Sequence, residues 1–449
     1  MKKTKLTARE YLLVASMLFG MFFGAGNLIF PVSMGQQAGS RMLPAAIGFC
    51  ITGVGLPLLG VAAMGISESK SLFHMSSFVS RGFAYFFTCA LYLTIGPLFA
   101  IPRTATVSFQ VGIAPSVPES SRGLLLAVFS LAFFGAVLFF SLRPSNILTW
   151  VGKILNPLFL AFMVLLIVIA FLNPMGKVSQ TAPTGAYAES SFFTGFLEGY
   201  NTMDALASLA FGIVLIEVIR GLGVTDPLCV SACTVKAGAF STLPMALLYC
   251  CLTVLGAQSA AKLGISTDGG VALFYIAKHH FGSVGGAFLG ILATFACLKT
   301  AIGLVTSCSR AFAEMFPRLC SYKVYAIVFS VFSFAVSNVG LSAIIKISLP
   351  VLMLLYPMII VLILLCLLGR LFDYRKCVFL STMSLTIFAA VLDLILHLPE
   401  TVQSVMPFGR HLMGLGAILP LAALRMGWIV PAILGFVIGL AIRAFQKKK

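Results

Sequence analysis

The chain has 449 residues, of which 60% are hydrophobic and only 10% are charged, and its mean hydropathy is +1.06. A soluble domain carries about 25% charged residues, so this composition excludes one and predicts a protein that crosses the membrane many times. Basic loops facing an anionic membrane surface account for the net charge of +17 without a nucleic-acid partner.

The first apolar segment, from Tyr11 to Met34, is interrupted at its centre. At about 24 residues it is too long for a signal-peptide core of about 7 to 15, so we interpret it as an uncleaved first span. Gly24-Ala25-Gly26-Asn27 interrupts it, and an unwound turn in hydrocarbon exposes backbone groups at a cost of several kcal/mol each unless they line a cavity or bind a ligand. The interruption therefore predicts a binding site.

Apolar stretches of about 20 residues, the length that crosses a bilayer, occur twelve times along the chain. They lie at 11–34, 43–67, 82–109, 123–141, 147–172, 196–219, 229–257, 284–309, 323–338, 341–368, 378–397 and 416–443. Twelve spans place both termini on one side, and the excess of Lys and Arg on that side predicts that it is cytoplasmic. We expect Arg103 near the opposite face, as an interfacial anchor or loop partner, with a gate as the alternative. The predicted location is the cytoplasmic (inner) membrane.

Two polar connections, at 173–195 and 258–283, fall on the outer side in this arrangement. The first separates five spans from the next five, and five is an odd number, so the second group enters the membrane with opposite topology. This order permits an inverted repeat. We expect a cytoplasmic tail 1–10, a first repeat 11–172, the connection 173–195, a second repeat 196–368, two further helices at 369–443 and a basic cytoplasmic tail 444–449.

The sixth span is also interrupted, by small and polar residues from Gly199 to Ser208. The first helix of each half is thus broken, which is the paired signal of a transport site. Asp204 is the one acid near the middle of this segment, and an intramembrane carboxylate suggests an ion partner, a proton carrier or a clamp for an ammonium group. The alternative is an aspartate that caps a helix.

Four motifs together resemble the branched-chain amino acid carrier family, the bacterial cation symporters for leucine, isoleucine and valine. They run from the first span to the tenth: Gly24 to Pro31 with Gly35 and Gln37-Ala38-Gly39; Gly96 to Phe99 with Pro102 to Phe109; Thr202-Met203-Asp204 with Phe211 to Val214; and Ser337-Asn338 with Gly340 to Ser342. The resemblance implies an all-α membrane protein with a LeuT-like five-plus-five inverted repeat, of the amino acid/polyamine/organocation superfamily, plus two C-terminal helices.

The resemblance implies an amino acid substrate, whose carboxylate and ammonium groups both need partners when buried. A broken helix offers free N–H groups to the carboxylate and free carbonyls to a cation. Packing between helices is the alternative explanation for Gly20 and Gly24. The predicted substrate-binding residues are Gly24, Ala25, Gly26, Asn27, Thr202, Met203, Asp204, Ala205 and Leu206.

Lys299 stands in the middle of the eighth span, on one helical face with Ala296 and Thr300. In symporters of this superfamily the matching positions help to bind sodium against the first helix break, so the resemblance implies a cation site formed by Gly20, Phe23, Ala296, Lys299 and Thr300. This site binds either Na+ or the lysine ammonium group itself, and in the second case Lys299 acts as a surrogate cation or as a proton carrier. A lysine that snorkels or pairs with Asp204 for structural reasons is a further alternative.

The predicted function is import of leucine, isoleucine and valine by alternating access, coupled to Na+ or H+. The alternatives are a cation-independent exchanger or facilitator that also accepts methionine, and an amino acid sensor on a transporter fold. The sequence has neither the phosphate-binding loop of a pump nor the H-E-x-x-H motif of a metalloprotease, so no enzyme activity and no cofactor besides the coupling ion are expected. The expected partners are the small apolar substrate and the lipid bilayer, and the sequence leaves the oligomeric state open.

Overall fold

The computed structural model describes residues 3–69, 71–143, 147–396, 398, 416 and 418–447, and these form helices joined by short turns. The predicted tails at 1–10 and 444–449 are therefore described only from Lys3 and as far as Lys447. Much of the predicted start of the twelfth span, between 416 and 428, also lies outside the described residues or in turns.

The first half of the chain contains the following helices: α1 (Ala8–Phe22), α2 (Ala25–Ala38), η1 (Gly39–Arg41), α3 (Met42–Cys50), η2 (Ile51–Gly55), α4 (Leu56–Ile66), α5 (Leu72–Ser77), α6 (Arg81–Leu93), η3 (Thr94–Leu98), α7 (Ala100–Gly112), η4 (Ala114–Ser116), α8 (Glu119–Leu142) and α9 (Ile147–Leu172). The second half contains η5 (Val178–Gln180), α10 (Ala186–Glu198), η6 (Gly199–Thr202), α11 (Asp204–Gly221), α12 (Pro227–Leu263), α13 (Gly269–Met315), α14 (Tyr322–Ser337), α15 (Leu341–Leu368), η7 (Gly369–Phe372), α16 (Lys376–Leu396), η8 (Ala422–Leu424) and α19 (Ile429–Lys447). Each of the twelve predicted apolar segments contains helical residues, although the twelfth does so mainly from Ile429 onward.

Three of the predicted spans are broken. The first is interrupted between Phe22 and Ala25, where Gly24 has an extended backbone. The sixth is interrupted at Met203, which is left-handed with φ of 60°. The third break, which we did not predict, lies at Gly96, where ψ of −128° ends the helical path one residue before Pro97. Proline lacks the N–H that would continue the helix, so Gly96-Pro97 gives this break a local cause.

Two predicted boundaries are wrong. The connection expected at 258–283 is mostly helical, because α12 continues to Leu263 and α13 begins at Gly269. Asp268 caps α13, since its Oδ1 accepts hydrogen bonds from the N–H groups of Gly270 and Val271 at 2.8 and 3.0 Å. The positive φ of Gly282 then kinks the helix. A capped helix needs no apolar run, and a scan for hydrophobic stretches misses it. The twelfth span is also shorter than expected, because α19 begins at Ile429.

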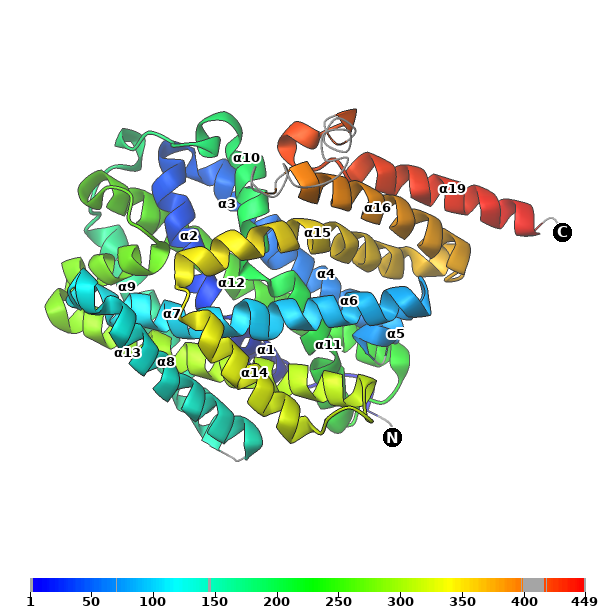
Figure 1. The fold of residues 1–449 in the computed structure, drawn as a ribbon, viewed down its shortest axis with the longest axis horizontal. Coiled ribbons are helices and arrows are strands. Elements are labelled where there is room, and N and C mark those ends of the chain that lie inside the picture. The colour runs from blue at the N-terminus through cyan, green and yellow to red at the C-terminus, as the bar shows by residue number, and fades with distance from the viewer. Residues whose placement is uncertain are drawn as a thin grey trace.

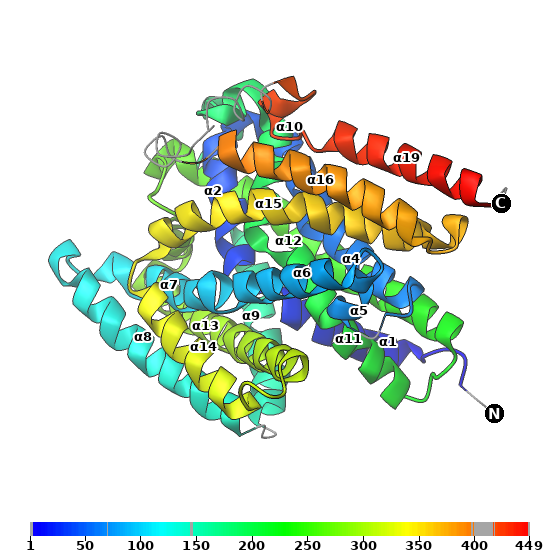
Figure 2. The same ribbon diagram turned by 45° about the vertical axis from the view of Figure 1, so that its right-hand side comes forward.

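The long helices run side by side through the molecule (Figure 1). Eight described helices are long and apolar enough to cross a membrane, or nine when the bent pair α10–η6 and α11 counts as one span. In both views α15, α16 and α19 form a layer along one edge, and α8 lies beside α14 at the other (Figures 1 and 2). Both ends of the chain lie at the same end of the long helices (Figures 1 and 2).

The opposite end of the bundle is closed by hydrogen bonds between segments distant in the sequence. The connection at 173–195 lies on the end of α2, where the Ser40 N–H donates to the Thr181 carbonyl and the Thr184 N–H to the Gln37 carbonyl, each at 2.8 Å. The buried Gln36 side chain donates to Ser259 Oγ at 3.0 Å and accepts from the Ser266 N–H at 3.0 Å. These bonds tie the first broken helix to α12 and to the turn that follows it.

Candidate functional site

The two helix breaks meet at a buried cluster of three side chains, Asn27, Asp204 and Tyr249, which we call the polar triad. Asn27 Nδ2 donates to Asp204 Oδ2 at 2.7 Å and also contacts the Tyr249 hydroxyl, which donates to the same carboxylate oxygen at 3.0 Å. Asn27 Oδ1 accepts from the Gly24 N–H at 3.0 Å. The triad therefore links α2, α11 and α12 at the level of both breaks.

Asp204 opens α11, but it does not cap the helix. Its carboxylate accepts hydrogen bonds from the side chains of Asn27 and Tyr249, and the residue before it, Met203, occupies the capping position without a side-chain bond. Local turns shape the break, because the Thr202 hydroxyl donates to the Gly199 carbonyl at 2.9 Å and the Met203 N–H donates to the Tyr200 carbonyl at 3.0 Å. The carboxylate consequently faces the first break.

A small cavity of about 40 Å³ lies between the breaks. Seven of the predicted substrate-binding residues line it: Gly24, Ala25, Gly26, Asn27, Thr202, Met203 and Asp204. Ala205 and Leu206 are fully buried but lie away from its lining, whereas Ala207 and Phe211 belong to it. Ala207 follows Leu206 directly, and Phe211 lies about one turn further along the same face as Ala207, so the apolar wall of the cavity is formed by a different face of α11 from the one we expected.

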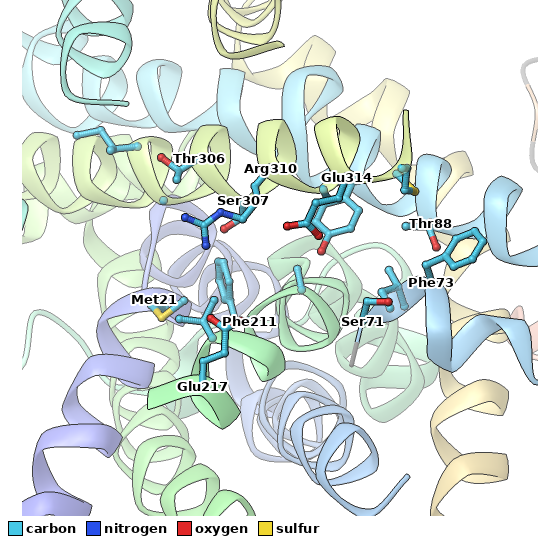
Figure 3. Close-up of a pocket in the computed structure, with 18 of the residues that line it drawn as sticks. Met21, Ser71, Phe73, Thr88, Phe211, Glu217, Thr306, Ser307, Arg310 and Glu314 are labelled. Atoms are coloured by element: carbon cyan, nitrogen blue, oxygen red, sulfur yellow. The ribbon is translucent and has the colours of Figure 1, made fainter. Parts of the chain in front are cut away.

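A larger cavity of about 610 Å³ adjoins the small one, because Met21, Phe211 and Thr300 line both. Polar and charged side chains surround it: Arg310 and Glu314 point into it from α13, opposite Phe211 and Glu217 of α11 (Figure 3). Ser71 and Phe73 at the beginning of α5 and Tyr85 in the first turns of α6 also line it. This cavity therefore lies toward the end of the bundle that carries the two termini (Figure 1).

The residues of the predicted cation site fall in several environments. Thr300 packs against the first break, since a Cβ on Gly24 would lie 3.1 Å from its Cγ2, and its hydroxyl donates to the Ala296 carbonyl at 3.2 Å. Gly20 and Lys299 line the large cavity. Phe23 packs between Phe19 and Phe159 and lines neither cavity. Within the described part of the chain, no ion pair joins Lys299 to Asp204.

The expectation for Arg103 is wrong. It lies inside the protein at 2% exposure, not at the outer interface. Its guanidinium stands over the Phe30 ring, 5.1 Å from the centroid, and it lines the small cavity beside Gly26. Among the described residues, its Nη1 has no hydrogen-bond partner. We placed Arg103 at the end of a span because we assigned each basic residue to one side of the membrane. The break at Gly96 instead starts a new helix, α7, at Ala100, and Arg103 lies in the first turn of this helix, inside the protein.

Sequence reasoning also missed two tyrosines that flank the second break. Tyr249 belongs to the polar triad, and Tyr200 stacks on Tyr356 of α15 with ring centroids 3.8 Å apart and an angle of 11° between planes. A tyrosine inside an apolar span normally has a partner for its hydroxyl, so Tyr249 offered a signal in the sequence. Its partners lie 45 and 222 positions away, and the sequence alone does not identify them.

Comparison with known proteins gives close relatives along the whole chain. Residues 7–446 match the family described as "Branched-chain amino acid transport protein". The branched-chain amino acid permease BrnQ of Lactobacillus delbrueckii subsp. lactis is 47% identical over 448 residues, covering 100% of this chain and 99% of the relative. BrnQ of Bacillus subtilis (strain 168) is 39% identical, with 99% of each chain covered. BrnQ of Escherichia coli (strain K12) is 37% identical, with 97% and 96% covered.

Solved structures with a similar fold are transporters. The inward-facing conformation of Mhp1 aligns with a TM-score of 0.60 at 12% identity, covering 99% of this chain and 96% of that one. MhsT in complex with L-phenylalanine aligns with a TM-score of 0.52 at 15% identity, covering 97% and 99%. These similarities confirm the predicted LeuT-like fold. The family match over residues 7–446 and the relatives at 37–47% identity show that the chain belongs to the family of branched-chain amino acid transport proteins.

Proposed function

We propose that this protein imports leucine, isoleucine and valine across the cytoplasmic membrane by alternating access, coupled to a cation. The observation that carries the proposal is the unequal access to the two ends of the bundle. The end near Gln36 and Thr181 is closed by hydrogen bonds, whereas the 610 Å³ cavity lies toward the end that carries the termini. With both termini in the cytoplasm, as the positive-inside rule predicts, this is an inward-facing state.

The substrate site in this proposal is the small cavity at the two breaks. The Asp204 carboxylate provides a partner for the substrate ammonium, and N–H groups in the first turn of α2 have no partner within their own helix. Met203, Ala207 and Phe211 supply an apolar wall for a branched side chain. At about 40 Å³ the cavity has room for little more than a few water molecules, so it represents a contracted site after release of the substrate.

Release then proceeds through the three residues that the two cavities share. Met21, Phe211 and Thr300 stand between the small cavity and the large one, and all three come from different helices, α1, α11 and α13. A movement of α1 or α11 relative to α13 widens this passage without disturbing the bonds at the closed end. Such rigid-body motion around a fixed site is the way in which inverted-repeat transporters alternate.

The coupling ion is either Na+ or H+ in this proposal, and the role of Lys299 determines whether the cation site binds an ion at all. Lys299 is partly buried, lines the large cavity next to Thr300 and has no ion pair with described residues. This favours a second candidate, in which its ammonium group takes the place of sodium and the protein exchanges apolar amino acids, including methionine, without a cation. Lys299→Met keeps the length of the side chain and removes the charge, and it separates the two candidates.

Uptake by purified protein in vesicles tests both. Radiolabelled leucine, isoleucine, valine and methionine are offered with a Na+ gradient, a proton gradient or neither, and Lys299→Met is measured beside the wild-type protein. Accumulation of leucine above the outside concentration with one gradient supports coupled import. Exchange without a gradient, lost in Lys299→Met, supports the second candidate. Binding of leucine without any flux would contradict both and favour a sensor, whereas Na+-dependent uptake that is constant across pH would exclude Lys299 as a surrogate cation.

A further inference from the structure

Arg103 is a permanently charged group in the interior of this membrane protein. It lies on α7 with 2% of its surface exposed, and its neighbours in the chain, Pro102 and Thr104, are buried as well. Guanidinium stays protonated in proteins and carries five N–H donors in a fixed fork. A charge buried in this way needs an anion or several acceptors, because desolvation without a partner is costly. Nη1 of Arg103 has neither among the described residues.

The resident acids do not neutralise Arg103. Among the described residues, Asp204 and Glu198 are the carboxylates close enough to act on it electrostatically, and neither forms an ion pair with it. Asp204 is bonded to the other two members of the polar triad. The ring of Phe30 covers one face of the guanidinium, which fixes its plane but supplies no anion. The charge on Arg103 therefore remains available to a ligand.

The space in front of the guanidinium is the start of α2. A Cβ on Gly26 would lie 3.3 Å from Arg103 Nη2, so the guanidinium packs closely against the bare backbone at the start of this helix. Arg103, Gly26 and Asp204 all line the small cavity, which places a cation and the beginning of a helix against the same space as a carboxylate. The N–H groups of a first helical turn and a guanidinium fork both favour a carboxylate.

We propose that Arg103 binds the α-carboxylate of the transported amino acid, together with the first turn of α2, while Asp204 receives its ammonium group. This rests on the function proposed above and adds the residue that recognises the acid end of the substrate. The site then selects for a zwitterion: a ligand with the same branched side chain but no carboxylate leaves Arg103 buried without a partner. Leucinamide and isoamylamine are such ligands.

Binding of leucine, leucinamide and isoamylamine to purified protein tests the proposal, with wild-type, Arg103→Gln and Arg103→Lys chains. A charge-assisted bidentate bond predicts that Arg103→Gln weakens leucine binding about 10- to 100-fold and narrows the preference for leucine over leucinamide by a similar factor. Arg103→Lys keeps the charge but loses the fork, so it should bind leucine with intermediate affinity and still reject leucinamide. Arg122→Gln, on the exposed surface of α8, is the matched control and should bind leucine as the wild type does.

The outcomes separate this proposal from the function on which it rests. If the wild-type protein binds no branched-chain amino acid, the proposed function fails. If the wild type binds leucine and Arg103→Gln binds it equally well, or loses leucine and leucinamide in the same proportion, Arg103 is not the carboxylate partner. Leucine binding that requires chloride in the wild type and loses this requirement in Arg103→Gln, with the preference for leucine over leucinamide unchanged, would assign Arg103 to an inorganic anion and overturn the proposal. Should Arg103→Gln fail to fold, Arg103→Lys provides the test. Weaker leucine binding with the preference over leucinamide kept supports the proposal, and leucine binding at wild-type affinity contradicts it.

Discussion

Gly256 on α12 lies against the backbone of α2, and replacing it with alanine tests how closely these helices must approach. A Cβ at this position would lie 2.9 Å from the carbonyl carbon of Val32 and would meet its oxygen as well. Ordinary contacts of a Cβ begin at 3.4 Å, so the carbonyl carbon alone requires the helices to separate by 0.5 Å, the difference between 3.4 and 2.9 Å, and the oxygen, which lies closer still, requires more. The obstacle is backbone, and no side chain can rotate away to relieve it.

Overpacking of this kind costs about 1–3 kcal/mol. At an unfolding entropy of about 2.1 cal/mol/K per residue, this cost lowers the Tm of a chain of this length by roughly 1–3 °C. The functional loss should be larger, because the same two helices carry Asn27 and Tyr249 of the polar triad. A separation of half an ångström or more stretches their hydrogen bond. We therefore expect a large loss of leucine uptake together with only a small decrease in Tm.

Gly135→Ala on α8 is the matched control, since a Cβ there meets no atom within 4 Å. Uptake and Tm are measured for both variants in the same preparation, and Gly35→Ala approaches the interface from the other side, against Thr253 and Ala257. An unchanged Tm and unchanged uptake in Gly256→Ala would refute the reasoning that the contact between α2 and α12 holds the triad. Equal losses in Gly135→Ala would show that the effect is not specific to the contact.

Three further predictions concern the breaks and the N-terminal cap. Tyr249→Phe removes a hydrogen bond to a buried carboxylate, worth about 1.5–3 kcal/mol, and should reduce leucine affinity about tenfold or more; wild-type affinity would show that the triad does not shape the site. Gly24→Ala places a Cβ 3.1 Å from Thr300 Cγ2 and should lower uptake, while the added change Thr300→Ala should restore affinity for leucine in part; an unaffected single variant would contradict this packing. The hydrogen bond from Lys3 and then those from Thr7 lower the pKa of Glu10 from 4.5 to about 2. A carboxylate with a lowered pKa stabilises the fold above its ordinary pKa and loses this effect as the pH falls through the lowered value. The Tm difference between wild type and Glu10→Gln should therefore be equal at pH 7 and pH 5 and shrink only between about pH 4.5 and 2, and a difference that is already lost at pH 5 would argue against the Lys3 contact.

The sequence predicted the breaks because their causes are local. Glycines and polar side chains inside an apolar run weaken a helix wherever they lie, so the interruptions near Gly24 and Met203 could be read from composition. The break at Gly96 had the same kind of local signal in the Gly96-Pro97 pair, and it escaped notice because the surrounding segment is long enough to cross the membrane unbroken.

The content of the site could not be predicted in the same way. The depth of Arg103 depends on where α7 starts after its break and on the ring of Phe30, which belongs to another helix. The turn from Gly199 to Met203 decides which face of α11 lines the cavity, so Ala207 lies there and Ala205 does not. Contacts between residues far apart in the chain carry no periodic signature, and only the folded structure brings them together.

The stacked rings of Tyr200 and Tyr356 give the two sides of the second break different mechanical properties. Hydrogen bonds weaken steeply when their distance or angle changes, so the polar triad favours one arrangement of α11 relative to α12. Two parallel rings attract mainly through dispersion and offset stacking, which change gently when one ring slides in its own plane. In the alternating-access cycle proposed above, the η6 turn can therefore slide along α15 without breaking a directional bond, so the stacked tyrosines would support movement of the second half-helix.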